Sequence, residues 1–193
     1  MGKYYKAARP NGRDFYTDSV DYAALCGTGK RLPELPGGEC CGPGVYHAST
    51  VAAETLIDGE WPCRVFEVEG EPVSEEGSKR GFRTLTVVRE LDAHLALGPN
   101  GAAVAALVER AGRLTADEAR ELGAAWDAWD TWAAWDARDA AEAAAMYAAR
   151  SAARPAAEVA AGYAAMALAV RDLITPEQFE LLCGPWRSVI GPK

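Results

Sequence analysis

The chain has 193 residues, 49% of them hydrophobic, which is enough to bury the core of one large or two small domains. Its formal charge of −8 is spread evenly, because residues 1–97 carry 11 basic and 15 acidic side chains and residues 98–193 carry 9 and 13. This balance argues against a nucleic-acid partner, since nonspecific affinity for phosphates comes from Lys and Arg. No apolar stretch has the length of a signal peptide or a membrane span. We therefore expect a cytoplasmic protein with no membrane partner.

The first half, residues 1–97, consists of short β-branched and aromatic runs broken by Gly and Pro, which predicts a small antiparallel β-rich domain. A strand at 4–7, a turn at 10–12 and a second strand at 14–17 have the pattern of a hairpin. The segment Cys26–Gly44 is rich in Gly and Pro and predicts a long irregular loop, a kind of segment that is often functional.

Three further strands are expected in this half. Residues 44–48 read as a strand that leads into a short helix over 51–57. Residues 64–69 alternate apolar and charged side chains, the period of a half-exposed strand. Residues 82–90 form the strongest strand pattern of the chain, and the polar, charged stretch 72–81 is expected to be the connection before it, of hairpin or longer type.

The second half, residues 98–193, predicts an all-helical hairpin or bundle, so that the whole chain belongs to the α+β class. Thr115 and Glu118 form a capping box at the start of an Ala-rich run, and Pro155 lacks an amide proton. One long central helix over about 116–154 follows from this pattern. Gly184 and Pro185 are expected to end the last helix of the bundle.

Four tryptophans recur at every third residue of the predicted long helix. Each step of three turns the helix by about 300°, so the indoles fan over roughly half of its circumference and cannot form one stripe. Such a helix needs cover from other helices or from a second copy of the chain. An apolar stripe after Pro155 is the expected partner inside the chain, made up of Val159, Tyr163, Met166, Val170 and Leu173. The candidate interaction residues are Trp126, Trp129, Trp132 and Trp135.

The five cysteines are odd in number and lack paired C-x-x-C spacing, which predicts reduced thiols. The vicinal cysteines Cys40 and Cys41 lie seven and six residues before His47. This spacing leaves open a metal site or a nucleophile–base pair. A zinc site needs a fourth ligand and the two closed spacings typical of such sites, which are absent here, so no metal is expected. The cysteines are Cys26, Cys40, Cys41, Cys63 and Cys183.

Several short motifs of the first half resemble an uncharacterised domain of bacteriophage and prophage proteins. They are residues 4–7 (YYKA), 13–16 (RDFY), 44–48 (GVYHA), 65–70 (VFEVEG) and 86–91 (TVVREL). The Ala/Trp/Asp-rich second half is similar to C-terminal parts of small actinobacterial and actinophage proteins. These resemblances imply a phage or prophage origin and a bacterial host cytoplasm, and they imply no activity.

Two hypotheses about function follow. The first is a noncatalytic interaction or accessory protein, without a cofactor, that binds a host or phage protein or associates with itself. The second comes from a resemblance to the ADP-ribosyltransferase fold, in which Gly-x-Tyr on a strand leads into a short helix and the Tyr stacks on the nicotinamide of NAD. Gly44 and Tyr46 match that element, and the resemblance implies NAD as cofactor and Tyr46 and His47 as catalytic-site residues. The sequence departs from the pattern because Tyr5 and Lys6 stand where His or Arg is expected, and neither Glu69 nor Glu90 is assignable as the acid.

Overall fold

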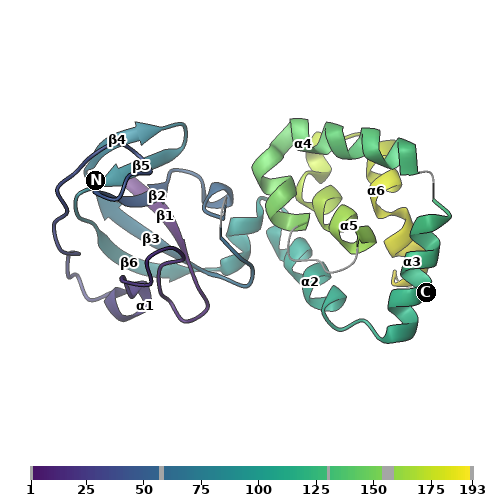
Figure 1. The fold of residues 1–193 in the computed structure, drawn as a ribbon, viewed down its shortest axis with the longest axis horizontal. Coiled ribbons are helices and arrows are strands. Elements are labelled where there is room, and N and C mark those ends of the chain that lie inside the picture. The colour runs from purple at the N-terminus through teal and green to yellow at the C-terminus, as the bar shows by residue number, and fades with distance from the viewer. Residues whose placement is uncertain (1, 57–58, 130, 154–158, 192–193) are drawn as a thin grey trace. The chain divides into compact units, whose positions relative to one another are not determined.

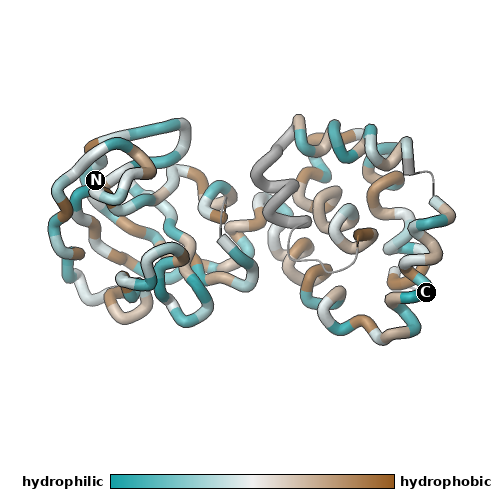
Figure 2. Tube along the Cα trace, viewed as in Figure 1, coloured by the Kyte–Doolittle hydropathy of each residue, from teal (hydrophilic) through white to brown (hydrophobic). Residues whose placement is uncertain are grey.

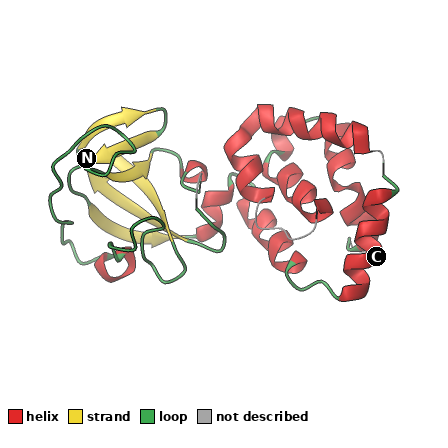
Figure 3. Cartoon of the chain, viewed as in Figure 1, coloured by secondary structure: helices red, strands yellow, loops and turns green. Residues whose placement is uncertain are grey.

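The computed structural model describes residues 2–56, 59–129, 131–153 and 159–191. Its internal contacts divide the chain into two compact units, Met1–Ala96 and Leu97–Lys193, which are described separately below. The first unit is built on an antiparallel sheet and the second consists of helices (Figure 3). The α+β class predicted from the sequence is confirmed.

The first unit holds a six-stranded sheet with the strand order β4-β5-β2-β1-β3-β6 (Figure 1). All of its strand pairs are antiparallel. The strands are β1 (Gly2–Ala8), β2 (Tyr46–Ser49), β3 (Arg64–Gly70), β4 (Pro72–Glu76), β5 (Lys79–Phe82) and β6 (Thr86–Leu91). Three short helical segments accompany them: α1 (Tyr22–Leu25), η1 (Ala52–Glu54) and η2 (Ala93–Leu97).

The main core of this unit lies on one face of the sheet, under α1 and the long loop. Phe66, Val68 and Phe82 point into it from the strands, as the two-residue period of a strand requires. Leu32 closes it from the loop, and its backbone amide donates to the carbonyl of Leu85 at 2.9 Å. The predicted Cys26–Gly44 loop is therefore free of regular helices and strands but is tied to the sheet.

Four local predictions in this unit need correction. Residues 14–17 form a turn in place of a strand, because the Asp14 carboxylate accepts hydrogen bonds from the amides of Tyr16 and Thr17 at 3.0 Å each. The stretch 72–81 is a hairpin of β4 and β5 that turns at Gly77, whose φ of 56° suits glycine. The expected strand 82–90 is divided between β5 and β6, and the expected helix 51–57 is the single turn η1. Ile57 lies outside the described residues.

The second unit is a bundle in which α5 is the central helix, surrounded by α2, α3, α4 and α6 (Figure 1). Alanine and glycine make up most of α5, so its neighbours approach closely on every side, and Figure 2 shows its predominantly hydrophobic residues. The helices are α2 (Gly101–Ala111), α3 (Ala116–Asp127), α4 (Thr131–Ala153), α5 (Val159–Ala169), η3 (Arg171–Leu173) and α6 (Pro176–Val189).

The prediction of one long central helix over 116–154 is wrong. The structure has two helices in its place, because α3 ends at Asp127 and α4 begins at Thr131. The start is as expected: the Thr115 hydroxyl accepts from the Glu118 amide and the Glu118 carboxylate accepts from the Thr115 amide. Helix α3 then ends at Asp127, and Trp129 turns inward to α6. Tertiary contacts of one indole override a run of strong helix formers here. The expected end of the helix at residue 154 lies outside the described residues.

The last helix does not end at Gly184 and Pro185, as the sequence predicts, but continues to Val189. Proline has no amide proton, so the carbonyl of Leu181 loses the donor that residue 185 would supply in an ordinary helix. The indole Nε1–H of Trp129 donates to that carbonyl at 2.9 Å instead. Gly184 makes room for the ring, since a Cβ at this position would overlap the indole. The Trp129 side chain thus accounts both for the end of α3 at Asp127 and for the continuation of α6 past Pro185.

The apolar stripe expected on the helix after Pro155 is buried only in part. Met166 and Val170 are buried, but Val159 and Leu173 are more than half exposed. Alanines fill the remaining faces of α5. They are more buried than the residues of the predicted stripe, because four helices surround α5. The buried face of α4 that packs on α5 is likewise formed by small residues, Ala134, Ala137 and Ala141.

Candidate functional site

The four candidate tryptophans fall into two pairs with different environments. Trp126 is half-buried and packs on Tyr163 of α5, with ring centroids 4.6 Å apart. Trp129 is half-buried against α6 through its hydrogen bond to Leu181. Both rings hold the bundle together, as the packing hypothesis expected of all four.

Trp132 and Trp135 lie on the outer face of α4 and are 77% and 49% exposed. Their ring centroids are 5.6 Å apart, so the two indoles form one aromatic patch. Asp136 and Asp139 are exposed on the same face, at the three- and four-residue spacing that aligns side chains along a helix. We call Trp132, Trp135, Asp136 and Asp139 the α4 outer face. Exposed aromatic clusters of this kind are typical of binding surfaces.

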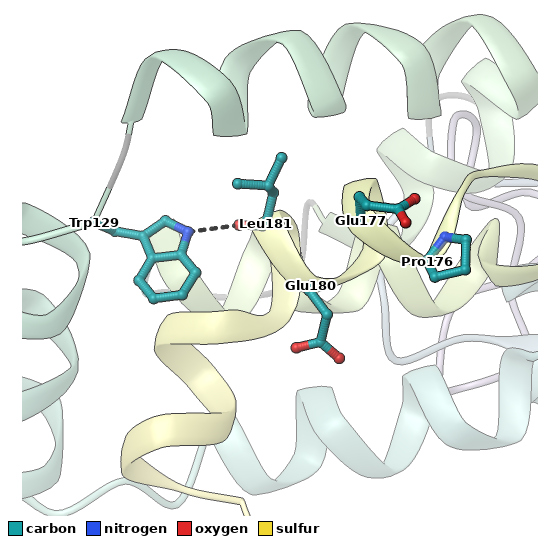
Figure 4. Close-up of a pocket in the computed structure, with 5 residues that line it drawn as sticks. All are labelled: Trp129, Pro176, Glu177, Glu180 and Leu181. Carbon is teal, nitrogen blue, oxygen red and sulfur yellow. Dashed lines mark hydrogen bonds between the residues drawn. The ribbon is translucent and has the colours of Figure 1, made fainter.

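A shallow hollow of about 410 Å³ lies beside the junction of α3 and α4. Trp129, Pro176 and Leu181 supply its apolar lining, and Glu177 and Glu180 add two carboxylates from α6. Figure 4 shows these carboxylates on successive turns of α6 and the indole of Trp129 directed at the Leu181 carbonyl. The hollow and the α4 outer face therefore share one composition, aromatic and acidic.

The alternative site residues, Tyr46 and His47, lie on β2 between β1 and β5. The ring of Tyr46 packs partly against the main core and its hydroxyl donates to the Pro33 carbonyl at 2.9 Å. His47 is the next residue on β2 and therefore points to the opposite face of the sheet from Tyr46. Its Nε2 is buried without a hydrogen-bond partner among the described residues. Burial and the charge of Lys6 lower the pKa of His47, so its imidazole is neutral near pH 7.

A buried ion pair lies close to His47. The Nζ of Lys6 is 2.9 Å from the Asp14 carboxylate, and both side chains are 10% exposed. Burial alone would raise the pKa of Asp14, but the ion pair and the hydrogen bonds from Thr17 and Tyr16 outweigh it and lower the pKa to about 2. Lys6 also lies over the ring of Tyr22, 5.5 Å from its centroid. The position where the transferase resemblance expects His or Arg thus holds a lysine in a structural ion pair.

Among the described residues, neither of the two acids considered for the transferase resemblance, Glu69 and Glu90, lies on a strand beside Tyr46. Strand β5, which pairs with β2, places Phe82 opposite Tyr46 and Gly81 opposite His47, and carries no carboxylate. Glu69 and Glu90 lie on β3 and β6, on the other side of β1, and Glu90 is ion-paired with Arg64 at 2.6 Å. The Asp14 carboxylate is near but is held by Lys6 and by the turn that it caps.

The cysteines are all reduced, and the vicinal pair has a different neighbour from the one expected. The Sγ atoms of Cys40 and Cys41 and a carboxylate oxygen of Glu76 lie within 4.8 Å of one another. His47 is not part of this group. Sequence spacing gave no sign of Glu76, which is 35 residues further along the chain than Cys41 and reaches the pair through the β4–β5 hairpin.

Comparisons with known proteins give no match: no family model, no curated protein and no solved structure is similar to this chain at a significant level. Among the described helices, none combines the length and the apolar composition needed to cross a bilayer.

Proposed function

We propose that the helical unit is a noncatalytic protein-binding module of an accessory protein of phage or prophage type. The exposed pair Trp132 and Trp135 is the observation that carries this proposal. Tryptophan loses little conformational freedom on binding and contributes large contact areas, which is why it is enriched at interface hot spots. The packing of α4 on α5 does not need two exposed indoles, because alanines supply it.

The charge around the patch favours a partner segment that carries basic and apolar side chains. Asp136 and Asp139 flank the indoles, and Glu177 and Glu180 line the hollow. Arg138 is ion-paired with Asp139 and Arg187 with Glu180, so Asp136 and Glu177 contribute most to this argument. A Lys or Arg can place its aliphatic stem on an indole and its charge beside a carboxylate. A second copy of the chain would bring like charges together on a symmetric interface, which opposes self-association through this face. The partner is therefore a basic protein of the phage or of its bacterial host.

The test uses an amphipathic helical peptide with Leu on one face and Lys and Arg on the other, and a second peptide with Glu in place of the basic residues. We expect the basic peptide to bind the full chain and to shift its tryptophan fluorescence, and the acidic peptide not to bind. The double variant Trp132→Ala/Trp135→Ala should weaken binding at least tenfold. Leu173→Ala, which also removes a large exposed side chain from the helical unit, is the matched control and should bind like the parent.

Equal binding of both peptides, or undiminished binding by the double variant, would refute this proposal. Light scattering on the same samples decides between partner types. A dimer that Trp132→Ala/Trp135→Ala dissociates would show that a second copy covers the α4 outer face, contrary to the charge argument.

A second candidate function is NAD binding by an ADP-ribosyltransferase-like first unit. Two observations favour it: β2 carries Tyr46 and His47 beside β1 and leads into the short turn η1, and His47 holds an unpaired buried ring nitrogen. Strand β5, which pairs with β2, carries no carboxylate among its described residues, which argues for binding without transfer. Calorimetric titration with NAD tests this candidate. Binding heat that is lost in Tyr46→Ala and kept in the control variant Tyr16→Ala would support NAD binding at Tyr46. The absence of binding heat from the parent chain would exclude it.

A further inference from the structure

The group formed by Cys40, Cys41 and Glu76 has the composition of a metal site. Two sulfur atoms and a carboxylate oxygen lie within 4.8 Å of one another, and all three belong to the first unit. Cys41 and Glu76 are exposed and Cys40 is half-buried, so an ion can reach the ligand atoms from solvent. We refer to Cys40, Cys41 and Glu76 as the thiol–carboxylate cluster.

Local backbone geometry explains why the two adjacent sulfurs share a side. Neighbouring side chains of an extended segment point in opposite directions, which would separate two vicinal thiols. Here residues 39–42 form a turn in which the Gly42 amide donates to the Glu39 carbonyl at 3.1 Å. Cys41 has a φ of 69° in this turn, a conformation that residues other than glycine rarely adopt. The turn therefore directs both thiols to the same side, where one ion can contact both sulfur atoms.

The β4–β5 hairpin supplies the third ligand and a counter-charge. Glu76 and Lys79 are paired across the hairpin, so both side chains lie at its turn. The Nζ of Lys79 is 3.7 Å from the Sγ of Cys41, so it places a positive charge beside the ligand atoms. With both thiols and the carboxylate ionised, the three ligands and Lys79 together carry two negative charges. A divalent cation neutralises the cluster.

We propose that Cys40, Cys41 and Glu76 bind one divalent, thiophilic cation of the zinc class, with water in the fourth position. Thiolate ligands select such ions over magnesium or calcium, and zinc accepts Cys and carboxylate ligands in a tetrahedron. Zinc–sulfur bonds of about 2.3 Å place tetrahedral sulfurs about 3.8 Å apart, so the observed spacing needs to contract by about 1 Å at most. Binding releases the two thiol protons to solvent and changes no oxidation state.

This site is independent of the peptide-binding proposal, because its residues lie in the other unit. The sequence analysis expected no metal and left open only a site made of the two cysteines and His47, whereas the group in the structure holds Glu76 in place of His47. His47 is half-buried on β2 and its ring nitrogens lie outside the thiol–carboxylate cluster, so it has no role in this site.

Cadmium is the probe for the experiment, because a thiolate bound to Cd²⁺ gives an ultraviolet charge-transfer band. The full chain, kept reduced with a phosphine, is titrated with Cd²⁺ and then with Zn²⁺ in competition. We expect one ion per chain and a band intensity that corresponds to two thiolates. Cys40→Ser and Cys41→Ser should each lower the affinity about 100-fold, and Glu76→Gln about tenfold, because each removes an anionic ligand.

Cys26→Ser is the matched control, since Cys26 is a half-buried thiol outside the cluster. It should leave the affinity and the band unchanged, and circular dichroism should show that all four variants fold. An affinity for Cd²⁺ that survives Cys40→Ser or Cys41→Ser, or that Cys26→Ser abolishes, would overturn the proposal. Equal affinity of Glu76→Gln and the parent would overturn the three-ligand site.

Discussion

The hydrogen bond from Trp129 to α6 leads to a quantitative prediction about stability. The carbonyl of Leu181 would accept from residue 185 in an ordinary helix, but Pro185 has no amide proton, and the Trp129 indole donates in its place. Trp129→Phe keeps an aromatic ring but removes the donor and also the outer ring atoms, Cζ2 and Cη2, that lie on Gly184. It should lower the free energy of unfolding by at least about 1 kcal/mol, the usual net value of one hydrogen bond, and the lost packing on Gly184 adds to this cost.

Trp129→Ala removes the ring as well. A fully buried aromatic side chain costs about 3–5 kcal/mol when truncated to alanine, and the half-buried position of Trp129 lowers that to about 2–3 kcal/mol. Trp132→Ala is the matched control, because that side chain is 77% exposed and its removal should change stability by less than about 0.5 kcal/mol. The comparison separates the packing tryptophans from the exposed ones on neighbouring turns of the chain.

A double-mutant cycle with Pro185→Ala isolates the hydrogen bond. The alanine introduced by this substitution would supply a backbone amide to the Leu181 carbonyl, so the indole donor would no longer be required. Trp129→Phe should then cost about 1 kcal/mol less in the Pro185→Ala background than in the parent, because only the loss of packing on Gly184 remains. Urea unfolding monitored by far-ultraviolet circular dichroism gives the four free energies. Equal costs of Trp129→Phe in both backgrounds would refute the role assigned to the indole.

Three further predictions concern pH, helix caps and thiols. Because the pKa of Asp14 is lowered to about 2 from its ordinary value of 3.8, its ion pair with Lys6 should contribute stability above about pH 4 that is lost as the pH falls towards 2. Allowing for solvent screening, the loss should be about 1–2 kcal/mol in urea unfolding, and Asp14→Asn should abolish this part of the pH dependence. Thr115→Ala should lower stability by about 1 kcal/mol through loss of the capping box, and Thr115→Ser should restore most of it. Burial raises the pKa of Cys63 and of Cys183 to about 12, so both should resist a thiol reagent at pH 8 until urea unfolds the chain, whereas the exposed Cys41 reacts in the folded state. Labelling of Cys63 or Cys183 as fast as Cys41 would contradict the burial.

The parts of the fold that follow from local chemistry were predictable from the sequence. The capping box at Thr115 fixes the start of α3, because both of its hydrogen bonds join residues three apart. The strand at residues 64–69 and the compositional change between the two halves led to the α+β class, but the half-exposed strand expected from the alternation was wrong, because Val65 and Glu67 on one face of β3 are as buried as Phe66 and Val68 on the other. Each of these signals depends on residues close together in the chain.

The break after α3 was not predictable in this way. Alanine, Asp and Trp at positions 124–130 carry no helix-ending signal comparable to Gly or Pro. The break depends on Leu181, 52 residues away, and on the missing amide of Pro185. The sequence rule that places a helix end at Pro185 was wrong for the same reason, since it takes no account of a donor from elsewhere in the chain.

The candidate sites show the same limit. A three-residue spacing cannot tell which tryptophans face α5 and α6 and which face solvent, because that depends on where α3 ends and α4 begins. The cysteine pair was visible in the sequence, but its neighbour Glu76 is brought near by the β4–β5 hairpin, in a stretch that the sequence predicted to be a polar connection of hairpin or longer type, without strands of its own.

The acidic residues on the α4 outer face have a physical consequence beyond partner choice. Two exposed indoles on an uncharged helix would attract any apolar surface, including the same face of another copy. Asp136 and Asp139 are exposed beside Trp132 and Trp135, so a symmetric contact would bury like charges near one another. A basic segment removes that penalty and pairs with the same carboxylates. Under the proposed function, the residues that oppose self-association are also the ones that would select a basic partner, and reversing their charge with Asp136→Lys/Asp139→Lys should exchange the preference from the basic to the acidic peptide.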